Sequence, residues 1–169
     1  VVAQALAAAR DAEAGPVAVR LRNAKRDMAL AVALADISGA WPLEKVTQSL
    51  SDFADVALDV SIATAIAERT PGAPNRGFVA LALGKHGSRE LNYSSDVDLI
   101  LLYDPDTLPH RENEEVADAA QRIARRMVEL MQARDAHGYV FRVDLRLRPS
   151  PEATPIALPI GAAEAYYHS

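Results

Sequence analysis

Residues 84–99 read GKHGSRELNYSSDVDL, and the fold that the sequence predicts follows from this stretch and its neighbours. The stretch follows an apolar run at 78–83 and leads into a second apolar run at 97–103. Two short apolar runs joined by a polar, glycine-containing segment predict two β-strands and a turn. The glycines let the backbone come close to a ligand and aim its amides at an anion, although their spacing matches neither the Walker loop nor the dinucleotide-binding fingerprint.

Two aspartates stand at the start of the second predicted strand. Asp96 and Asp98 are two residues apart, and side chains with that spacing share one face of a strand. Their carboxylates therefore point the same way and can hold a hard cation between them. Taken alone, such a pair is more typical of a solvated strand end than of a metal site.

The later segment FRVDLRLRP supplies a third aspartate, Asp144. In the strand predicted at 139–147, alternation places Asp144, Arg146 and Arg148 on one face and apolar residues on the other. A solvent-exposed sheet edge with surface ion pairs also explains this pattern. Combined with the acidic pair and the glycine turn, it favours a site in which the three aspartates hold a divalent metal ion and arginines hold phosphate.

The first part of the chain predicts helices. It is rich in alanine and repeats apolar residues at spacings of three and four. Glycine and proline breaks predict a short first helix, a second at 17–37 and a third reaching residue 69. A breaker cluster at 71–77 then separates a helical region, residues 1–72, from a predicted catalytic domain, residues 73–169.

Two more elements complete the prediction for the second part. Helical spacing recurs at 113–134, and the proline-containing run at 155–160 suits the edge of a sheet. The predicted fold class is α+β, with a small mixed sheet preceded by a helical region.

Composition restricts the function. The 169 residues contain 18 Lys plus Arg and 23 Asp plus Glu, a net charge of −5, which argues against sequence-independent binding to nucleic acid. The absence of cysteine removes disulfides, thiolate nucleophiles and cysteine-ligated metal sites, and favours the cytoplasm. No apolar run approaches the ~20 residues that cross a bilayer, so no membrane association is expected. Because the chain begins with valine, we expect a segment of a longer protein.

The motif set resembles that of a known superfamily. A glycine turn, Asp-x-Asp on one strand and a single Asp on a later strand resemble the nucleotidyltransferases typified by DNA polymerase beta. More narrowly, residues 84–99 together with VDLRLRPS at 143–150 are similar to the bifunctional bacterial glutamine synthetase adenylyltransferase/adenylyl-removing enzymes. The sequence segments ELNYSSD and RPSPEATP resemble the N-terminal, adenylyl-removing half of that family. One departure is His86, which stands where the family usually has leucine.

This resemblance implies a fold of the DNA polymerase beta type and an enzymatic activity. The implied reaction is metal-dependent phosphorolysis of adenylyl-tyrosine on glutamine synthetase to tyrosine and ADP, which regulates nitrogen assimilation. The alternatives are adenylyl transfer from ATP to that tyrosine and a non-catalytic module that binds nucleotide or a PII-type signalling protein. The implied cofactors and substrates are one or two Mg²⁺ ions, ADP or ATP, and inorganic phosphate.

The resemblance also distributes roles among the motif residues. It implies that carboxylates ligate metal and that the turn and the arginines contact phosphates. For two cationic residues in the turn, a structural or surface role is an equal alternative. The expected metal ligands are Asp96, Asp98 and Asp144; the expected phosphate contacts are Gly87, Ser88, Arg146 and Arg148, with Lys85 and Arg89 as the two open cases.

Several other polar residues are expected to be solvated. They comprise a histidine in the glycine turn, three aspartates at helical spacing, and a group of cations in the second predicted helix. These residues are His86; Asp52, Asp55 and Asp59; and Arg22, Lys25 and Arg26.

Overall fold

Three helices precede the sheet along the chain. The structure is a computed structural model that describes residues 1–13 and 15–168. A proline stands immediately before the second and the third helix, where its fixed φ angle and missing N–H interrupt no helical hydrogen bond. The three predicted helices are confirmed as α1 (Val2–Arg10), α2 (Val17–Ile37) and α3 (Leu43–Arg69).

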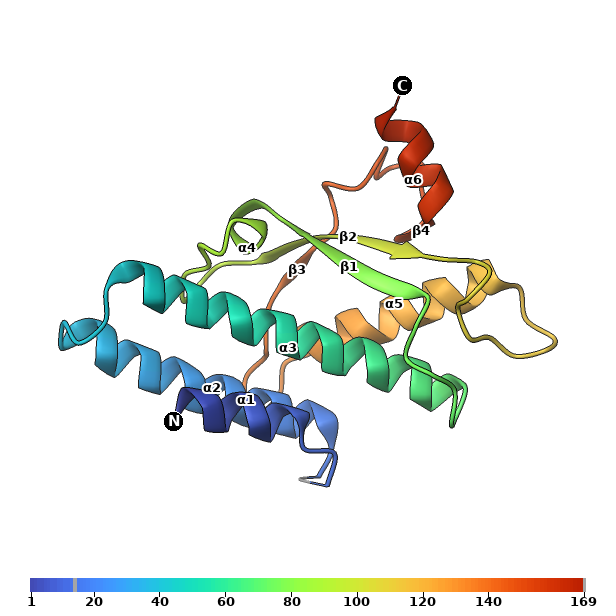
Figure 1. Cartoon of the computed structure of the whole chain (residues 1–169). Helices are drawn as coiled ribbons and strands as arrows, with labels where there is room; N and C mark the ends of the chain where they lie inside the picture. The colour runs from blue at the N-terminus through green and yellow to red at the C-terminus, as the bar shows by residue number, and fades with distance from the viewer. Residues whose placement is uncertain (14, 169) are drawn as a thin grey trace.

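Four strands form one small mixed sheet (Figure 1). Strand β1 (Phe78–Leu83) runs antiparallel to β2 (Val97–Tyr103). Along the other edge of β2, β3 (Val143–Asp144) pairs with its beginning and β4 (Ala157–Pro159) with its end, both in parallel. The predicted α+β class with a small mixed sheet is therefore confirmed.

The third predicted strand is much shorter than expected. Only β3 pairs, because the chain turns immediately afterwards: the amide of Arg146 donates to Oδ1 of Asp144 at 2.9 Å instead of to a neighbouring strand. The predicted alternation over 139–147 is consequently wrong beyond Asp144. Leu147, expected on the buried face, is 52% exposed.

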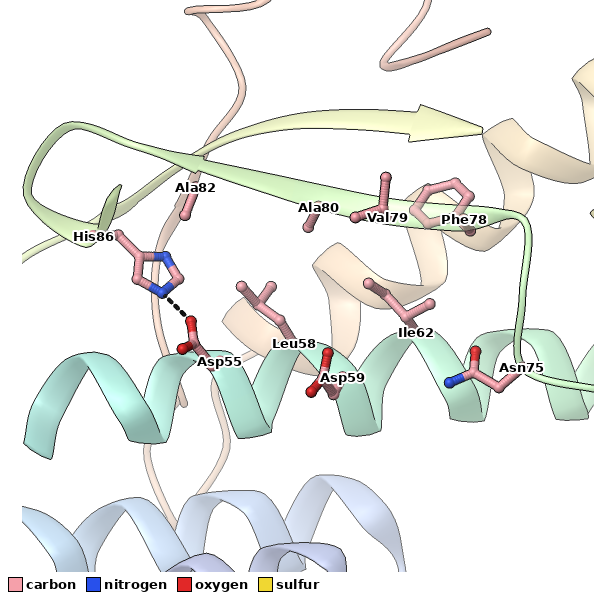
Figure 2. A pocket seen from close by; sticks show the side chains of 10 residues that line it. All are labelled: Asp55, Leu58, Asp59, Ile62, Asn75, Phe78, Val79, Ala80, Ala82 and His86. Atoms are coloured by element: carbon pink, nitrogen blue, oxygen red, sulfur yellow. Dashed lines mark hydrogen bonds and ion pairs between the residues drawn. The ribbon is translucent and has the colours of Figure 1, made fainter. Parts of the chain in front are cut away.

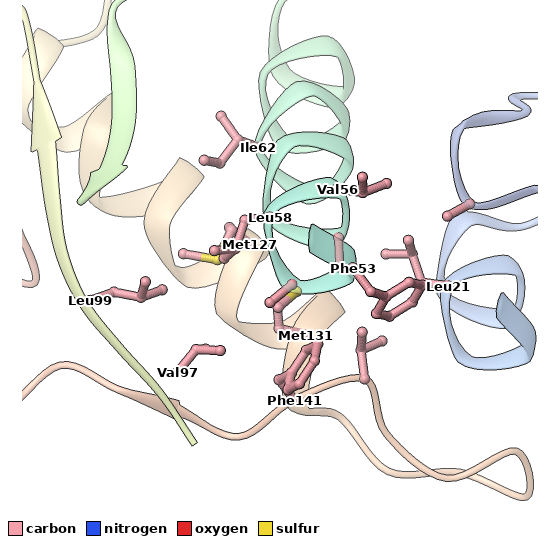
Figure 3. Packing of buried hydrophobic residues seen from close by; sticks show 14 of the residues in the cluster. Leu21, Phe53, Val56, Leu58, Ile62, Val97, Leu99, Met127, Met131 and Phe141 are labelled. Carbon is pink, nitrogen blue, oxygen red and sulfur yellow. The ribbon is translucent and has the colours of Figure 1, made fainter. Parts of the chain in front are cut away.

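Helix α5 (Val116–Gln132) and helix α3 lie against one face of the sheet (Figures 1 and 3). The side chains of β2 alternate, so that Val97 and Leu99 point into the core, where Figure 3 shows them facing Met127 and Met131 of α5. Asp98, between them in sequence, faces the opposite side of the sheet. The core thus fixes which face carries the aspartates.

One hydrophobic cluster runs through both halves of the chain. It includes Leu21 of α2, Phe53 of α3 and Phe141 near β3, and the rings of the last two have centroids 6.1 Å apart. The segment predicted to divide the chain lies between α3 and β1. A helix not anticipated from the sequence, α6 (Ile160–Tyr167), follows β4 directly. None of the helices within the described residues combines the length and the apolar character needed to cross a membrane.

Candidate functional site

A single helical turn, α4 (Gly84–Gly87), leads away from the end of β1. Gly84 has a φ of 53°, and a Cβ on it would lie 2.5 Å from Oδ2 of Asp98. A Cβ on Gly87 would lie 2.7 Å from the backbone oxygen of Ala82. The two glycines therefore let the turn pack against an aspartate on one side and against β1 on the other.

Asp98 and Asp144 lie side by side on neighbouring strands. They are register partners in the parallel pairing of β2 with β3. Partners of this kind project from the same face of a sheet, and the side chain of Asp144 is 14% exposed. The fold thus brings together two aspartates that are far apart in the sequence.

Asp96 precedes β2, and its carboxylate is held by Arg142. Nε of Arg142 donates to Oδ1 of Asp96 at 2.7 Å, and Nη2 donates to the carbonyl oxygen of Ser94 at 2.7 Å. The hydrogen bond from Arg142 and the charge of Asp96 raise the pKa of that guanidinium. The sequence reasoning did not include Arg142 in the site. Its position two residues before Asp144, in the same alternating segment, was the signal that could have identified it.

Arg146 is the direct ion-pair partner of Asp144. Its Nε donates to both carboxylate oxygens of Asp144, at 3.0 and 2.9 Å. These contacts hold the pKa of Asp144 below its ordinary value. Asp144 in turn raises the pKa of Arg146, and the charges of Asp96 and Asp98 add to this effect. A cationic group therefore already lies within electrostatic reach of Asp96, Asp98 and Asp144, which we call the edge carboxylates.

The edge carboxylates suit a hard divalent cation in their chemistry. Carboxylate oxygens are the ligands that Mg²⁺ prefers, and the cationic Arg146 already contacts one of these carboxylates. As the side chains stand, no three acidic, histidine or cysteine side chains among the described residues converge on one point. Arg142 and Arg146 hold two of the carboxylates instead. A metal ion at this edge would replace these guanidinium contacts.

The other residues expected to bind phosphate lie in two places. Ser88 is exposed at the end of the turn, where its hydroxyl contacts the carbonyl oxygen of Gly84 at 3.2 Å and the carboxylate of Glu90 at 3.1 Å. The neighbouring Lys85 is also exposed. Arg148 points elsewhere: its guanidinium donates to the backbone oxygens of residues 145 and 151, at 2.7 Å in both cases. It closes the loop that follows β3.

The turn is attached to α3 by polar contacts that the sequence reasoning misjudged. His86 was expected to be solvated, but it is 1% exposed, and its Nε2 lies 2.8 Å from Oδ1 of Asp55 (Figure 2). Arg89 contacts both Asp55 and Asp52. The expectation of a merely solvated face on α3 is therefore wrong for these two aspartates, because the turn folds back onto the helix.

Two cations of α2 also depart from expectation. Arg22 is buried, with Nη1 donating to Asp135 at 2.8 Å. Nζ of Lys25 lies 3.4 Å from the centroid of the Phe141 ring, and burial lowers the pKa of Lys25 to about 7. Neither is a freely solvated side chain, because the segment around Phe141 packs across this helix.

The fold and the site define a class: an α+β domain whose mixed sheet ends in adjacent aspartates beside a glycine turn. Comparison with known proteins gives the family. The family model described as glutamate-ammonia ligase adenylyltransferase matches residues 1–169, and the chain belongs to this family.

Similar proteins carry a consistent description. The chain is 42% identical over 160 residues to the bifunctional glutamine synthetase adenylyltransferase/adenylyl-removing enzyme of Caulobacter vibrioides, covering 88% of this chain and 16% of that protein. It is 42% identical over 174 residues to the protein of the same description from Rhizobium meliloti, covering 96% of this chain and 17% of that protein. The chain thus spans about a sixth of the length of these relatives.

Proposed function

We propose that this domain removes adenylyl groups from glutamine synthetase by phosphorolysis, on a nucleotidyltransferase fold of the DNA polymerase beta type. Family membership supports the link to glutamine synthetase modification, because the relatives are described as both adenylyltransferases and adenylyl-removing enzymes. The resemblance of ELNYSSD and RPSPEATP to the N-terminal half supports the removing direction. The observation that carries the proposal is the register pairing of Asp98 with Asp144 beside Gly84.

The reaction joins an anionic nucleophile to an anionic centre. An oxygen of inorganic phosphate attacks the adenylyl phosphorus, the bond from phosphorus to the tyrosine oxygen breaks, and the tyrosine oxygen takes a proton. The products are tyrosine and ADP. Tyrosinate is a tolerable leaving group because the pKa of tyrosine is about 10.

Electrostatic repulsion is the main obstacle, and the site holds the groups that reduce it. Arg142 and Arg146 are exposed guanidinium groups at the reacting end of the sheet, and guanidinium forks match phosphate oxygens. The hydroxyl of Ser88 supplies a further donor. The edge carboxylates would hold Mg²⁺, which neutralises phosphate charge and acts as a Lewis acid when bound.

The test uses adenylylated glutamine synthetase as substrate for the product of the complete reading frame that encodes this chain. We expect release of ADP that requires both inorganic phosphate and Mg²⁺. Uptake of label from ATP without phosphate-dependent release would indicate the opposite direction. Binding of nucleotide without either reaction would indicate a regulatory module and would overturn the proposal.

A further inference from the structure

A polar junction fastens the glycine turn to α3. Asp55 accepts from Nε2 of His86 at 2.8 Å with one carboxylate oxygen and contacts Arg89 with the other, and Asp52 contacts Arg89 as well. We call Asp52, Asp55, His86 and Arg89 the α3 clamp. Asp55 is its central member, because it holds both residues of the turn.

The packing beside the clamp is incomplete. A hollow of about 310 Å³ lies between α3 and β1, and the strand contributes the small side chains of Ala80 and Ala82 to its wall (Figure 2). Figure 2 shows His86 reaching down from the turn to Asp55 at one end of this hollow. Since apolar side chains do not fill the space, the clamp supplies a fixed connection between the turn and the helix at this end.

The clamp cannot be loosened without cost. His86 is 1% exposed, so removing its acceptor leaves a buried N–H without a partner, which is unfavourable because water cannot replace the lost hydrogen bond. Arg89 has a φ of 64°, a conformation that residues with a Cβ adopt only when their surroundings hold them. Asp55 contacts the turn at both points, and Asp52 adds a second contact to Arg89.

The same turn sets the surroundings of Asp98. The backbone amides of Ser88 and Glu90 donate to the carbonyl oxygens of Gly84 and Lys85, at 3.1 and 2.7 Å, so the turn is held together by its own hydrogen bonds. At its first residue, Gly84 packs closely against the carboxylate of Asp98. A shift of the turn away from α3 would therefore move Gly84 relative to Asp98 and Ser88 relative to any phosphate bound there.

We propose that Asp55 is a positioning residue for the candidate site. From α3 it holds the turn through His86 and Arg89, and thereby fixes Gly84 and Ser88 relative to Asp98. His86 and Arg89 both belong to the turn, and each contacts a different carboxylate oxygen of Asp55. The kinetic part of this inference rests on the proposed function; the structural part does not.

The experiment compares Asp55→Ala, Asp55→Asn and Asp59→Asn in the product of the complete reading frame. The asparagine substitution at position 55 keeps an oxygen that accepts from His86, whereas the alanine substitution keeps none. Asp59 lines the same hollow one turn further along α3, and no hydrogen bond joins it to the turn among the described residues. It is the matched control for loss of a carboxylate on this helix.

Two readouts are needed. The first is phosphorolysis, for which Asp55→Ala should lower kcat about 10- to 100-fold, with a smaller change in KM for phosphate. The second is amide hydrogen exchange, in which Asp55→Ala should accelerate exchange at Ser88, Arg89 and Glu90. Asp55→Asn should recover most of both losses, and Asp59→Asn should leave both close to wild type.

Each outcome is decisive. Unchanged kcat and unchanged exchange in Asp55→Ala would overturn the inference, as would equal losses in Asp55→Ala and Asp59→Asn. If the wild-type protein shows no phosphorolysis, the proposed function fails, but the exchange contrast between Asp55→Ala and Asp55→Asn still tests whether Asp55 holds the turn. A background of His86→Leu should reduce the effect of Asp55→Ala on exchange, because one of its two contacts is already absent.

Discussion

Two groups of aspartates and arginines flank the glycine turn, and they differ in how firmly they are held. In the α3 clamp, a histidine that is 1% exposed anchors the contact with Asp55. At the edge carboxylates, the partners are Arg142 and Arg146, whose side chains are 53% and 84% exposed. The clamp thus differs in having a buried histidine, while its aspartates and Arg89 are 36–44% exposed and the guanidinium groups at the edge carboxylates are more exposed still.

The difference follows from solvation. Exposed ion pairs contribute about 0–1 kcal/mol, because water and salt compete for both partners. A buried N–H has no such alternative, so its acceptor cannot leave without cost. We therefore expect the arginines at the edge carboxylates to leave their partners more easily than the buried histidine of the clamp leaves Asp55.

The largest expected effect is on the edge carboxylates. Asp98→Asn should lower phosphorolysis by about 1000-fold or more, because an amide is a poor ligand for a hard cation. The free energy of unfolding should change by less than about 1 kcal/mol, as for most substitutions outside the core. Asp106→Asn, in the exposed loop beyond the other end of β2, is the control and should retain wild-type turnover. Undiminished turnover in Asp98→Asn would show that Asp98 is not part of the catalytic site.

The second-largest effect is expected for a substitution in the glycine turn, which lies between the two groups. In Gly87→Ala the new Cβ would meet the backbone oxygen of Ala82 at 2.7 Å, so the backbone must shift. We expect the free energy of unfolding, measured by urea denaturation, to fall by about 2–3 kcal/mol. Gly161→Ala in α6 has open space around it and should not destabilise the protein. Equal effects of the two substitutions would show that the turn is not tightly packed.

Lys25, a partly buried cation of α2, gives a further test of how solvation affects stability. Lys25 packs over Phe141, and burial lowers its pKa from 10.5 to about 7. The unfolded chain therefore binds more protons than the folded one between pH 7 and 10.5, so this group makes stability rise with pH across that window. Below pH 7 both states are protonated, and the full cost remains.

Lys25→Met should remove that pH dependence. At pH 7 and below it should raise the free energy of unfolding by about 2 kcal/mol, because the apolar side chain avoids the desolvation cost. Urea denaturation of both proteins from pH 6 to 10 gives the comparison. Parallel pH profiles for wild type and variant would mean that Lys25 is solvated.

The smallest expected effect concerns Arg146. Arg146→Gln should change the free energy of unfolding by no more than about 1 kcal/mol, since the guanidinium group is 84% exposed. Carbon-detected NMR should show the pKa of Asp144 rising towards its ordinary value of 3.8. In the wild type, the stabilisation from this pair is present above pH 3.8 and is lost as the pH falls through the lowered pKa. An unchanged pKa of Asp144 in the variant would show that Arg146 does not interact with this carboxylate.

The sequence anticipated the elements that carry strong local signals. The bounds of α2, β1 and β2 match the predicted runs, because proline and glycine breaks and apolar periodicity act over a few residues. It failed where a side-chain contact competes with a local pattern. The strand expected at 139–147 ends at Asp144, because that side chain captures the amide of Arg146.

The sequence predicted the carboxylates of the candidate site. It did not predict the side-chain contacts that support them. Asp98 and Asp144 followed from alternation and family resemblance, while Arg142 was overlooked in the same segment. His86 and Asp55 are 31 residues apart, and no local pattern relates them. Their pairing depends on where the turn meets α3.

By itself, the sequence determined the order of helices and strands, the face of β2 that carries Asp98, and the family to which the chain belongs. Each of these depends on residue periodicity or on motifs within a short stretch. The tertiary structure alone decided which charged groups are buried or exchangeable, and hence that Asp55 holds the turn while Arg146 stays solvent-facing. Burial is a property of packed elements, and the free energy of a charged contact depends on how much water that packing excludes.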